Sequence, residues 1–364
     1  MQGFLNISLD IIKYNWTKLN HASNGKAAAV IKANAYGLGM IEITKALIDA
    51  GCNFFYLANL DEAITLRKKY PSNNISIAVF EGFFKGNEAF YFDNNLIPII
   101  NSLNQLKRLN KYNVTNQNKT SINAILNIDT GMNRLGLKKD EIDYIYENQD
   151  ILRSTKWEFA MSHLTSSSNI QNRSNQEQLK KINLFSEMFP HFKISFANTG
   201  GIILGESFCF DQTRPGIGLY GIDSFGNNLN IQNTKLKFPF EMFAPIIQIK
   251  SVPRGEKISY GGIDITIENS KLATVGIGYA DGWLRLLKKN SSFIIDDQEC
   301  RILGNITMDS FVIDITHIKK IALKEESYIK LVDNSNLKNI LNKLDLISYE
   351  FLTLIGSRIK RNYN

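Results

Sequence analysis

The sequence predicts an eight-stranded parallel α/β barrel followed by a mostly antiparallel β domain. Short apolar runs alternate with stretches of helical periodicity through the first two-thirds of the chain, as expected for parallel strands joined by crossover helices. From about residue 235 the helical pattern nearly vanishes, and short strands separated by turn residues replace it. No Gly-x-Gly-x-x-Gly motif follows the first strand, which argues against an open dinucleotide-binding sheet.

The barrel strands are predicted at short apolar runs, which are residues 27–31, 54–57, 75–80, 97–100, 123–128, 157–161, 194–197 and 218–220. Helices are predicted between them, at residues 41–50, 61–70, 102–112, 139–147 and 175–188. The helix at residues 61–70 ends in Arg67, Lys68 and Lys69, where cations suit the helix dipole. In such a barrel the active site is expected where the strands end, at the C-terminal face.

The β domain is predicted from strands at residues 244–252, 272–277, 292–295, 310–314 and 328–332, with a helix at 337–344. We place the barrel domain, which would bind a cofactor, at residues 1–234 and the C-terminal β domain at residues 235–364. No low-complexity linker marks this boundary.

Composition limits the class of protein. The chain has 364 residues, 44% hydrophobic and 21% charged, which excludes disordered and collagen-like proteins. A net charge of +7 fits an anionic ligand as well as nucleic acid, and no nucleic-acid-binding motif accompanies it. Three separated cysteines and four histidines without ligand spacing disfavour disulfides and zinc sites. Without a signal peptide or an apolar run of ~20 residues, a cytoplasmic protein with no membrane association is expected.

The most informative segment is residues 29–39, Ala-Val-Ile-Lys-Ala-Asn-Ala-Tyr-Gly-Leu-Gly. An apolar strand runs directly into Lys32 and then into a turn with two glycines. A half-buried lysine costs desolvation energy unless its charge is neutralised or consumed in a covalent bond. The alternative is a lysine at a strand end that extends its charged group to solvent. The lysine alone does not decide between these two interpretations.

The whole segment resembles the pyridoxal-phosphate lysine motif of alanine racemases, and the resemblance continues in register over nearly the whole chain. The further matching segments are 129–136 (Asp-Thr-Gly-Met-Asn-Arg-Leu-Gly), 162–164 (Ser-His-Leu), 198–199 (Asn-Thr), 214–221 (Arg-Pro-Gly-Ile-Gly-Leu-Tyr-Gly), 259–261 (Ser-Tyr-Gly), 276–282 (Gly-Ile-Gly-Tyr-Ala-Asp-Gly), 308–309 (Met-Asp), 349–350 (Tyr-Glu) and 356–358 (Gly-Ser-Arg). The sequence therefore resembles a racemase that interconverts L-alanine and D-alanine and supplies D-alanine for peptidoglycan.

The resemblance implies four catalytic residues. Lys32 would hold the cofactor, pyridoxal 5′-phosphate, and act as a base on one face of the substrate. Tyr260 would be the base on the other face, contributed by the second subunit of a head-to-tail homodimer. Because a tyrosine pKa near 10 suits neutral pH poorly, Arg214 and His163 would supply the field that lowers it. Arg214 would also donate to the pyridine nitrogen, since arginine is a permanent donor.

The remaining site residues follow from the same resemblance. The cofactor phosphate would be bound by the backbone N–H groups of the turn at Gly216 and Ile217 and by the hydroxyls of Thr199, Tyr36 and Tyr349. The remaining cofactor contacts and the substrate pocket would involve Asn198, His163, Arg134, Met308, Tyr279 and Tyr260. Among these, Arg134 would contact the ring oxygen of the cofactor, and Met308 and Tyr279 would bound a small pocket that excludes larger amino acids.

Four departures from the family pattern affect the surroundings of the site. Asn127 stands where many members carry a carbamylated lysine that braces Arg134, so a neutral amide or a bound anion must replace that lysine. Leu38 replaces a histidine, and Ser168 replaces a residue that is often acidic. Asn133 replaces a glycine, a change that a left-handed backbone position accepts.

The sequence motifs are also compatible with other activities. A racemase of broader specificity, or one for serine, has the same motifs. An amino-acid decarboxylase of the same architecture places an acidic residue at the pyridine nitrogen, which Arg214 disfavours. A non-catalytic pyridoxal-phosphate-binding protein would lack the segments at Tyr260 and Met308.

Overall fold

The computed structural model describes residues 1–72, 74–116, 121–222, 236–288, 292–295, 298–318, 323–344 and 346–364. The chain forms two compact units. The barrel unit comprises Asp10–Ala35 and Met40–Lys237, and the β unit comprises Met1–Leu9, Tyr36–Gly39 and Phe238–Asn364. The predicted domain boundary between residues 234 and 235 lies outside the described residues.

The barrel unit contains eight parallel strands, paired in the order in which they occur along the chain. They are β2 (Ala29–Val30), β3 (Phe54–Leu57), β4 (Ser76–Val79), β5 (Ile97–Ile100), β6 (Ala124–Asn127), β7 (Trp157–Met161), β8 (Ile194–Asn198) and β9 (Gln212–Arg214). The first and last strands meet, because Thr213 N donates to Lys26 O and Ala28 N donates to Thr213 O, both at 2.9 Å. The predicted barrel is therefore confirmed.

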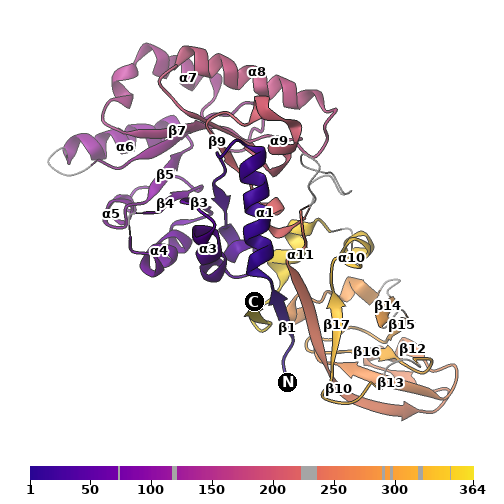
Figure 1. Ribbon diagram of the computed structural model, residues 1–364. Helices are drawn as coiled ribbons and strands as arrows, with labels where there is room; N and C mark the ends of the chain where they lie inside the picture. The colour runs from indigo at the N-terminus through magenta and orange to yellow at the C-terminus, as the bar shows by residue number, and fades with distance from the viewer. Residues whose placement is uncertain are drawn as a thin grey trace. The chain divides into compact units, whose positions relative to one another are not determined.

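Helices surround these strands (Figure 1). They are α1 (Leu9–Ala22), α3 (Met40–Asp49), α4 (Leu60–Lys69), α5 (Glu88–Asp93), α6 (Leu103–Thr115), α7 (Lys139–Glu147), α8 (Arg173–Met188) and α9 (Thr199–Leu204). Strands β3, β5 and β6 are buried at every position, as expected for a parallel sheet covered on both faces. Helix α4 begins where the Asn59 side chain accepts from Glu62 N, and it ends in the three basic residues noted above.

The strand predicted at residues 218–220 is wrong. These residues belong to the 3-10 helix η3 (Ile217–Tyr220), and the last barrel strand is β9, immediately before Pro215. Proline has no N–H for a strand ladder, so the strand ends there. Gln212 and Thr213 are polar but buried, and their polarity hid this strand from a search for apolar runs.

The β unit is built on a sheet with the strand order β14-β15-β16-β13-β10-β1-β18, and β17 also pairs with β10. Its strands are β1 (Phe4–Ile7), β10 (Phe240–Val252), β13 (Ser270–Val275), β14 (Ser292–Ile295), β15 (Gln298–Leu303), β16 (Phe311–Asp314), β17 (Tyr328–Val332) and β18 (Lys360–Tyr363). The hairpin of β11 (Lys257–Ile258) and β12 (Asp264–Ile265) and the helices α10 (Leu337–Leu344) and α11 (Ser348–Leu354) complete the unit. The N-terminal strand β1, which was not predicted, pairs antiparallel with β10 and parallel with β18.

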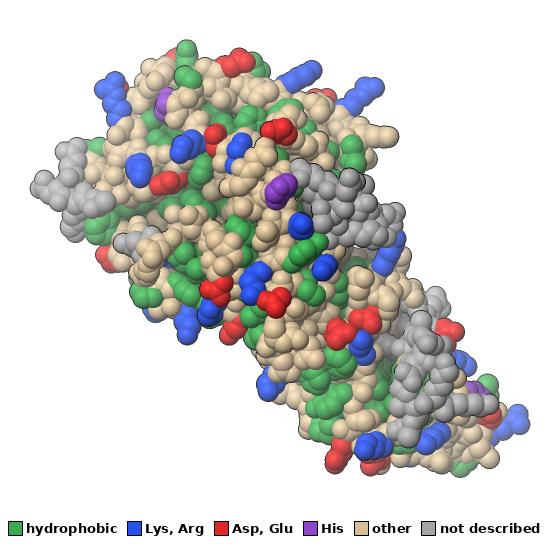
Figure 2. All heavy atoms as spheres, in the orientation of Figure 1, with side chains coloured by type: hydrophobic (Ala, Val, Ile, Leu, Met, Phe, Trp, Pro, Cys, Tyr) green, Lys and Arg blue, Asp and Glu red, His purple; other side chains and the backbone are tan. Residues whose placement is uncertain are grey.

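Charged side chains of both signs are interspersed on the face of the molecule in Figure 2. The net charge of +7 therefore does not form a single basic patch on this face. Within the described residues, no helix combines the length and the apolar character needed to cross a membrane.

Candidate active site

The predicted cofactor residues of the barrel unit lie at the ends of its strands. Lys32 follows β2, His163 follows β7, Asn198 ends β8 and Arg214 ends β9. Arg134 lies in the loop after β6. Because the strands are parallel, these positions share the C-terminal face of the barrel, which is where barrel enzymes carry their active sites.

Lys32 lies in an environment that disfavours its charged form. Its Nζ atom is 5.6 Å from the centroid of the Phe80 ring. Burial and, to a smaller extent, the positive charge of Arg134 lower the pKa of Lys32, while Glu62 opposes this shift. A lysine with a lowered pKa is more readily the neutral amine, which is the nucleophilic form.

A left-handed turn follows Lys32 directly. Ala33, Asn34, Ala35 and Tyr36 have φ angles of 52–55°, a region that side chains other than glycine seldom adopt. Two contacts hold the turn: Asn34 N lies 3.4 Å from Glu62 Oε1, and Met40 N donates to Asn34 Oδ1 at 2.8 Å. Strained backbone of this kind is concentrated at functional sites.

Arg214 is a fully buried cation held by neutral groups. Its Nη1 donates to Ser195 Oγ at 2.7 Å, and its Nη2 donates to the carbonyls of Ser162 at 2.5 Å and Phe196 at 3.3 Å. Burial lowers its pKa, and within the described part of the chain no carboxylate forms an ion pair with it. The guanidinium therefore keeps an uncompensated positive charge at the end of β9.

His163 is neutral at physiological pH. Burial and the positive charges of Arg214, Arg134 and Lys32 together lower its pKa to about 3. Its carbonyl accepts from Gln178 Nε2 at 2.8 Å, which joins helix α8 to the end of β7. These interactions link three predicted cations, Lys32, Arg134 and Arg214, electrostatically to His163.

The segment after β8 and the turn after β9 converge on one hydroxyl. Gly216 N and Gly218 N both donate to Thr199 Oγ1 at 3.2 Å. The neighbouring Asn198 accepts from Gly201 N and from Ser167 Oγ, both at 2.9 Å. Backbone amides that point at a single oxygen are suited to bind an anion such as a phosphate.

The β unit holds the other predicted residues. The rings of Tyr36 and Tyr349 lie side by side, with centroids 5.9 Å apart, and burial raises the pKa of Tyr36, so its hydroxyl stays a donor. Tyr279 and Met308 are on adjoining loops, because Ala280 N donates to Met308 O at 3.1 Å. Tyr260 is on the surface, with 76% of its area exposed, and its carbonyl accepts from Asn305 Nδ2 at 3.1 Å.

Comparison with known proteins identifies the family of the chain. The profile of the alanine racemase N-terminal domain matches residues 7–224, and that of the C-terminal domain matches residues 240–363. An alanine racemase from Rickettsia bellii is 37% identical over 347 residues, which cover 94% of this chain and 83% of that protein. One from Brucella ovis is 33% identical and covers 99% of this chain and 93% of that protein.

The comparison with solved structures points to the same family as the comparison of sequences. The crystal structure of an alanine racemase from Bartonella henselae with covalently bound pyridoxal phosphate has a TM-score of 0.92 and 33% identity, with 100% of both chains covered. This chain belongs to the alanine racemase family. Alanine racemases are isomerases that depend on pyridoxal phosphate, so the predicted enzyme class and cofactor are confirmed.

The side chains of this alanine racemase family member fit the cofactor. Pyridoxal phosphate carries an aldehyde, a ring nitrogen and a phosphate. Lys32, with its lowered pKa, suits the aldehyde, the buried Arg214 suits the ring nitrogen, and the amides beside Thr199 suit the phosphate. The cluster of positive charges also matches a ligand that carries net negative charge.

Two of the departures from the family pattern can be described structurally. Asn133 has a φ angle of 56°, so the left-handed position expected for it is confirmed. Asn127 donates through Nδ2 to Asn101 Oδ1 at 2.7 Å. The backbones of the same two asparagines hold the loop that carries Arg134, because Leu137 N donates to Asn127 O at 2.8 Å and Gly136 N donates to Asn101 O at 3.3 Å.

Sequence reasoning missed the residues that surround Arg214. Ser195 Oγ donates to Gln212 Oε1 at 3.0 Å, and the Tyr56 hydroxyl bonds the same oxygen. All three side chains are buried in the barrel. The available signal was polarity at Ser195 inside an otherwise apolar strand, which indicates an inward-facing polar group that needs a partner.

Proposed function

We propose that this chain racemises alanine by a two-base mechanism, with Lys32 on one face of the substrate and Tyr260 of the partner subunit on the other. The observation that carries this proposal is Arg214, a buried cation without a carboxylate among its described partners. An arginine side chain carries only donors, so Arg214 would be a permanent donor toward a ring nitrogen. A donor there leaves the ring a weaker electron acceptor than an acidic residue would, which favours reprotonation over decarboxylation.

Pyridoxal phosphate, bound covalently to Lys32, supplies a conjugated ring that withdraws electrons from the substrate α-carbon. Lys32 would accept or return a proton on one face of the substrate as the neutral amine that its lowered pKa favours. Tyr260 does the same on the opposite face. The proton therefore leaves from one side and returns from the other, which inverts the α-carbon.

The other proposed site residues bind and orient the cofactor and the substrate. Thr199, Gly216 and Ile217, together with the hydroxyls of Tyr36 and Tyr349, hold the phosphate, and Asn198 fixes the start of α9 beside Thr199. Arg134 binds the ring oxygen of the cofactor and the substrate carboxylate. His163, as a neutral imidazole, would pass hydrogen bonds between Arg214 and Tyr260.

Tyr260 acts in a homodimer in this proposal. It is exposed, and three isoleucines that follow it at every second position, Ile263, Ile265 and Ile267, are exposed as well. Exposed apolar side chains of this kind mark association surfaces. A second copy of the chain would cover them and receive Tyr260 at its own Lys32.

The activity is tested by incubating the purified chain with pyridoxal phosphate and L-alanine and resolving the products by chiral chromatography. D-alanine should accumulate until both enantiomers are equal, without loss of carbon. Borohydride treatment should fix the cofactor on Lys32, and the Lys32→Ala variant should form no D-alanine. Release of carbon dioxide, or label on another residue, would contradict the proposal. Parallel assays with L-serine test the broader or serine-directed specificity.

A complementation experiment tests the composite site. Lys32→Ala and Tyr260→Phe subunits are each inactive or impaired, and they are mixed, dissociated and reassociated. If Tyr260 acts on the other subunit, a mixed dimer contains one site with both native residues and activity returns. If Tyr260 acts on its own subunit, every site keeps one defect and activity stays absent.

We place the enzyme in the cytoplasm, where it would supply D-alanine to peptidoglycan synthesis. Deletion of the gene should then create a requirement for added D-alanine, which a plasmid copy relieves and a Lys32→Ala copy does not.

A further inference from the structure

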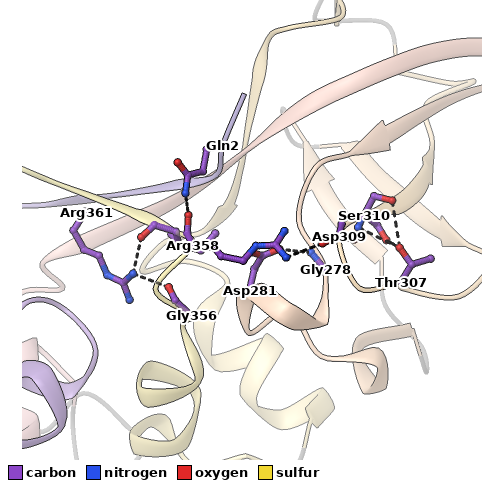
Figure 3. Close-up of polar contacts among 10 residues, drawn as sticks. Gln2, Gly278, Asp281, Thr307, Asp309, Ser310, Gly356, Arg358 and Arg361 are labelled. Carbon is purple, nitrogen blue, oxygen red and sulfur yellow. Dashed lines mark hydrogen bonds and ion pairs between the residues drawn. The ribbon is translucent and has the colours of Figure 1, made fainter.

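Arg358 joins two loops of the β unit that carry proposed substrate-pocket residues (Figure 3). Its Nε lies 3.0 Å from Asp281 Oδ1, and its Nη1 lies 2.7 Å from Asp309 Oδ1. Asp281 ends the 3-10 helix η5 (Tyr279–Asp281), which begins with Tyr279. Asp309 directly follows Met308 in the chain. One guanidinium therefore links the segments of Tyr279 and Met308.

Asp281 is the fixed side of this link. Its side chain is buried, and its Oδ2 accepts from Gly278 N at 2.9 Å. Its carbonyl accepts from Gly356 N at 3.2 Å, so the turn that precedes Arg358 is bonded to η5 as well. A buried carboxylate with both oxygens engaged cannot turn away without leaving polar atoms unsatisfied.

The C-terminal turn that carries Arg358 is anchored too. Arg361 donates through Nη1 to the carbonyls of Gly356 at 2.7 Å and Ile359 at 2.6 Å. The Gln2 side chain bonds the carbonyl of Arg358 itself, which ties the turn to the N-terminal segment. The side chain of Arg358 therefore extends from a turn that several hydrogen bonds hold in place.

The loop at residues 307–310 packs against η5 on one side and bonds Arg358 on the other. Tyr279 N donates to Thr307 O at 3.0 Å and Ala280 N to Met308 O at 3.1 Å. A Cβ at Gly278 would lie 2.3 Å from the carbonyl oxygens of Thr307 and Met308, so only glycine permits this approach. The Arg358–Asp309 ion pair, with side chains 51% and 61% exposed, holds the loop from its outer side.

We propose that Arg358 is a positioning residue that sets the width of the substrate pocket by holding the Met308 loop against η5. This inference rests on the proposed function, in which Tyr279 and Met308 bound the pocket. The exposed ion pair with Asp309 is screened by solvent and contributes little to global stability. Its removal therefore loosens the loop without unfolding the domain, and a loosened loop admits larger amino acids.

The experiment compares Asp309→Asn and Arg358→Gln with Arg358→Lys and with Asp150→Asn. Arg358→Lys keeps the positive charge but loses the planar guanidinium that bonds Asp281 and Asp309 together, so it should preserve only part of the wild-type protection from exchange. Asp150→Asn removes another solvent-exposed aspartate–arginine pair, with Arg153, in the barrel unit and serves as the control. Hydrogen exchange of the Tyr279 and Ala280 amides is measured in each holoenzyme.

In Asp309→Asn and Arg358→Gln these amides should exchange at least tenfold faster than in the wild type, and in Asp150→Asn they should not change. The KM for L-alanine should rise severalfold with kcat within twofold, and kcat/KM for L-serine relative to L-alanine should increase. Unchanged exchange would show that Arg358 does not hold the Met308 loop against η5. Faster exchange with unchanged KM and specificity would show that this contact does not set the width of the substrate pocket. A wild type without racemase activity would overturn the proposed function, while the exchange data would still decide whether Arg358 holds the loop.

Discussion

The Nη1 atom of Arg214 lies 2.7 Å from the hydroxyl oxygen of Ser195, and that hydroxyl donates in turn to Gln212 at 3.0 Å. A neutral side chain therefore orients a buried cation where a carboxylate would ordinarily be expected. This arrangement leaves the positive charge of Arg214 undiminished. We therefore expect Ser195 to determine the orientation of the Arg214 guanidinium.

Replacing Ser195 with alanine should weaken cofactor binding. The change removes an acceptor of a charge-assisted hydrogen bond, worth about 1.5–3 kcal/mol, and frees the guanidinium to tilt. We expect the Kd of the apoenzyme for pyridoxal phosphate to rise about tenfold, as measured by fluorescence titration. Ser195→Thr, which keeps the hydroxyl, should bind nearly as well as the wild type.

The matched control is Ser154→Ala, which removes a hydroxyl that donates to Asn110 at 2.6 Å elsewhere in the barrel unit. If Ser195→Ala and Ser154→Ala change the Kd equally, Ser195 does not orient Arg214.

The lowered pKa of His163 should make stability depend on pH in a defined window. The folded chain has a pKa of about 3 against the ordinary 6.5, so between these values only the unfolded chain binds the proton. Stability therefore falls as the pH drops below 6.5. Between pH 6.5 and 5 the wild type should lose about 1–2 kcal/mol more than His163→Gln, measured by urea unfolding of the apoenzyme.

A second measurement isolates the cause of this shift. Arg134→Gln removes one of the cations that lower the pKa of His163, so that pKa should rise in an NMR titration. Arg153→Gln removes an arginine that is paired with Asp150 and should leave the His163 titration unchanged. Equal titration curves in all three proteins would show that Arg134 does not contribute to the lowered pKa of His163.

Much of the barrel could be predicted from the sequence because its strands are continuous apolar runs. β3 and β5 lie at the predicted positions, and their side chains are buried throughout. β9 could not be found in this way, since its buried residues Gln212 and Thr213 are polar. β1 was not found either, because its partners β10 and β18 lie far from it in the sequence.

The candidate site was predicted largely through the family resemblance, which named residues but not their support. Nothing in the sequence indicated that Asn127 would bond Asn101, because Asn127 ends β6, Asn101 follows β5, and the contact exists only after the sheet forms. The left-handed turn after Lys32 was also unforeseen. Alanine has no preference for that backbone region, so Ala33 and Ala35 carry no signal of it.

The Asn101–Asn127 pair should show energetic coupling. Each substitution by alanine leaves a buried polar group without its partner and should lower the free energy of unfolding by about 1–3 kcal/mol. In a double-mutant cycle the two changes should couple by about 1 kcal/mol, measured by urea unfolding. Asn113→Ala combined with Asn101→Ala is the control, since Asn113 bonds Ile122 instead and should be additive. Additivity of the Asn101–Asn127 cycle would mean that their side-chain bond contributes nothing to stability.

The left-handed turn after Lys32 should be relieved by glycine. Ala33 is exposed and has a φ angle of 52°, a conformation that costs about 1–2 kcal/mol for a residue with a Cβ. Glycine adds about 0.5–1 kcal/mol of unfolded-state entropy, so Ala33→Gly should raise the free energy of unfolding by about 0.5–1 kcal/mol. Ala89→Gly, at an exposed position of the right-handed helix α5, should lower it by about 1 kcal/mol.

Both changes are measured by thermal and urea unfolding, and destabilisation by Ala33→Gly to the same extent as by Ala89→Gly would refute strain at this turn.

The Ala33→Gly variant also tests whether the strained turn serves catalysis. Glycine lets the turn adopt other conformations, so Lys32 should spend less time in the orientation that holds the cofactor, and kcat should fall although the protein is more stable. A gain in stability with unchanged kcat would mean that the left-handed turn serves only to connect β2 with α3, and that Lys32 is oriented by Glu62 and the barrel wall alone.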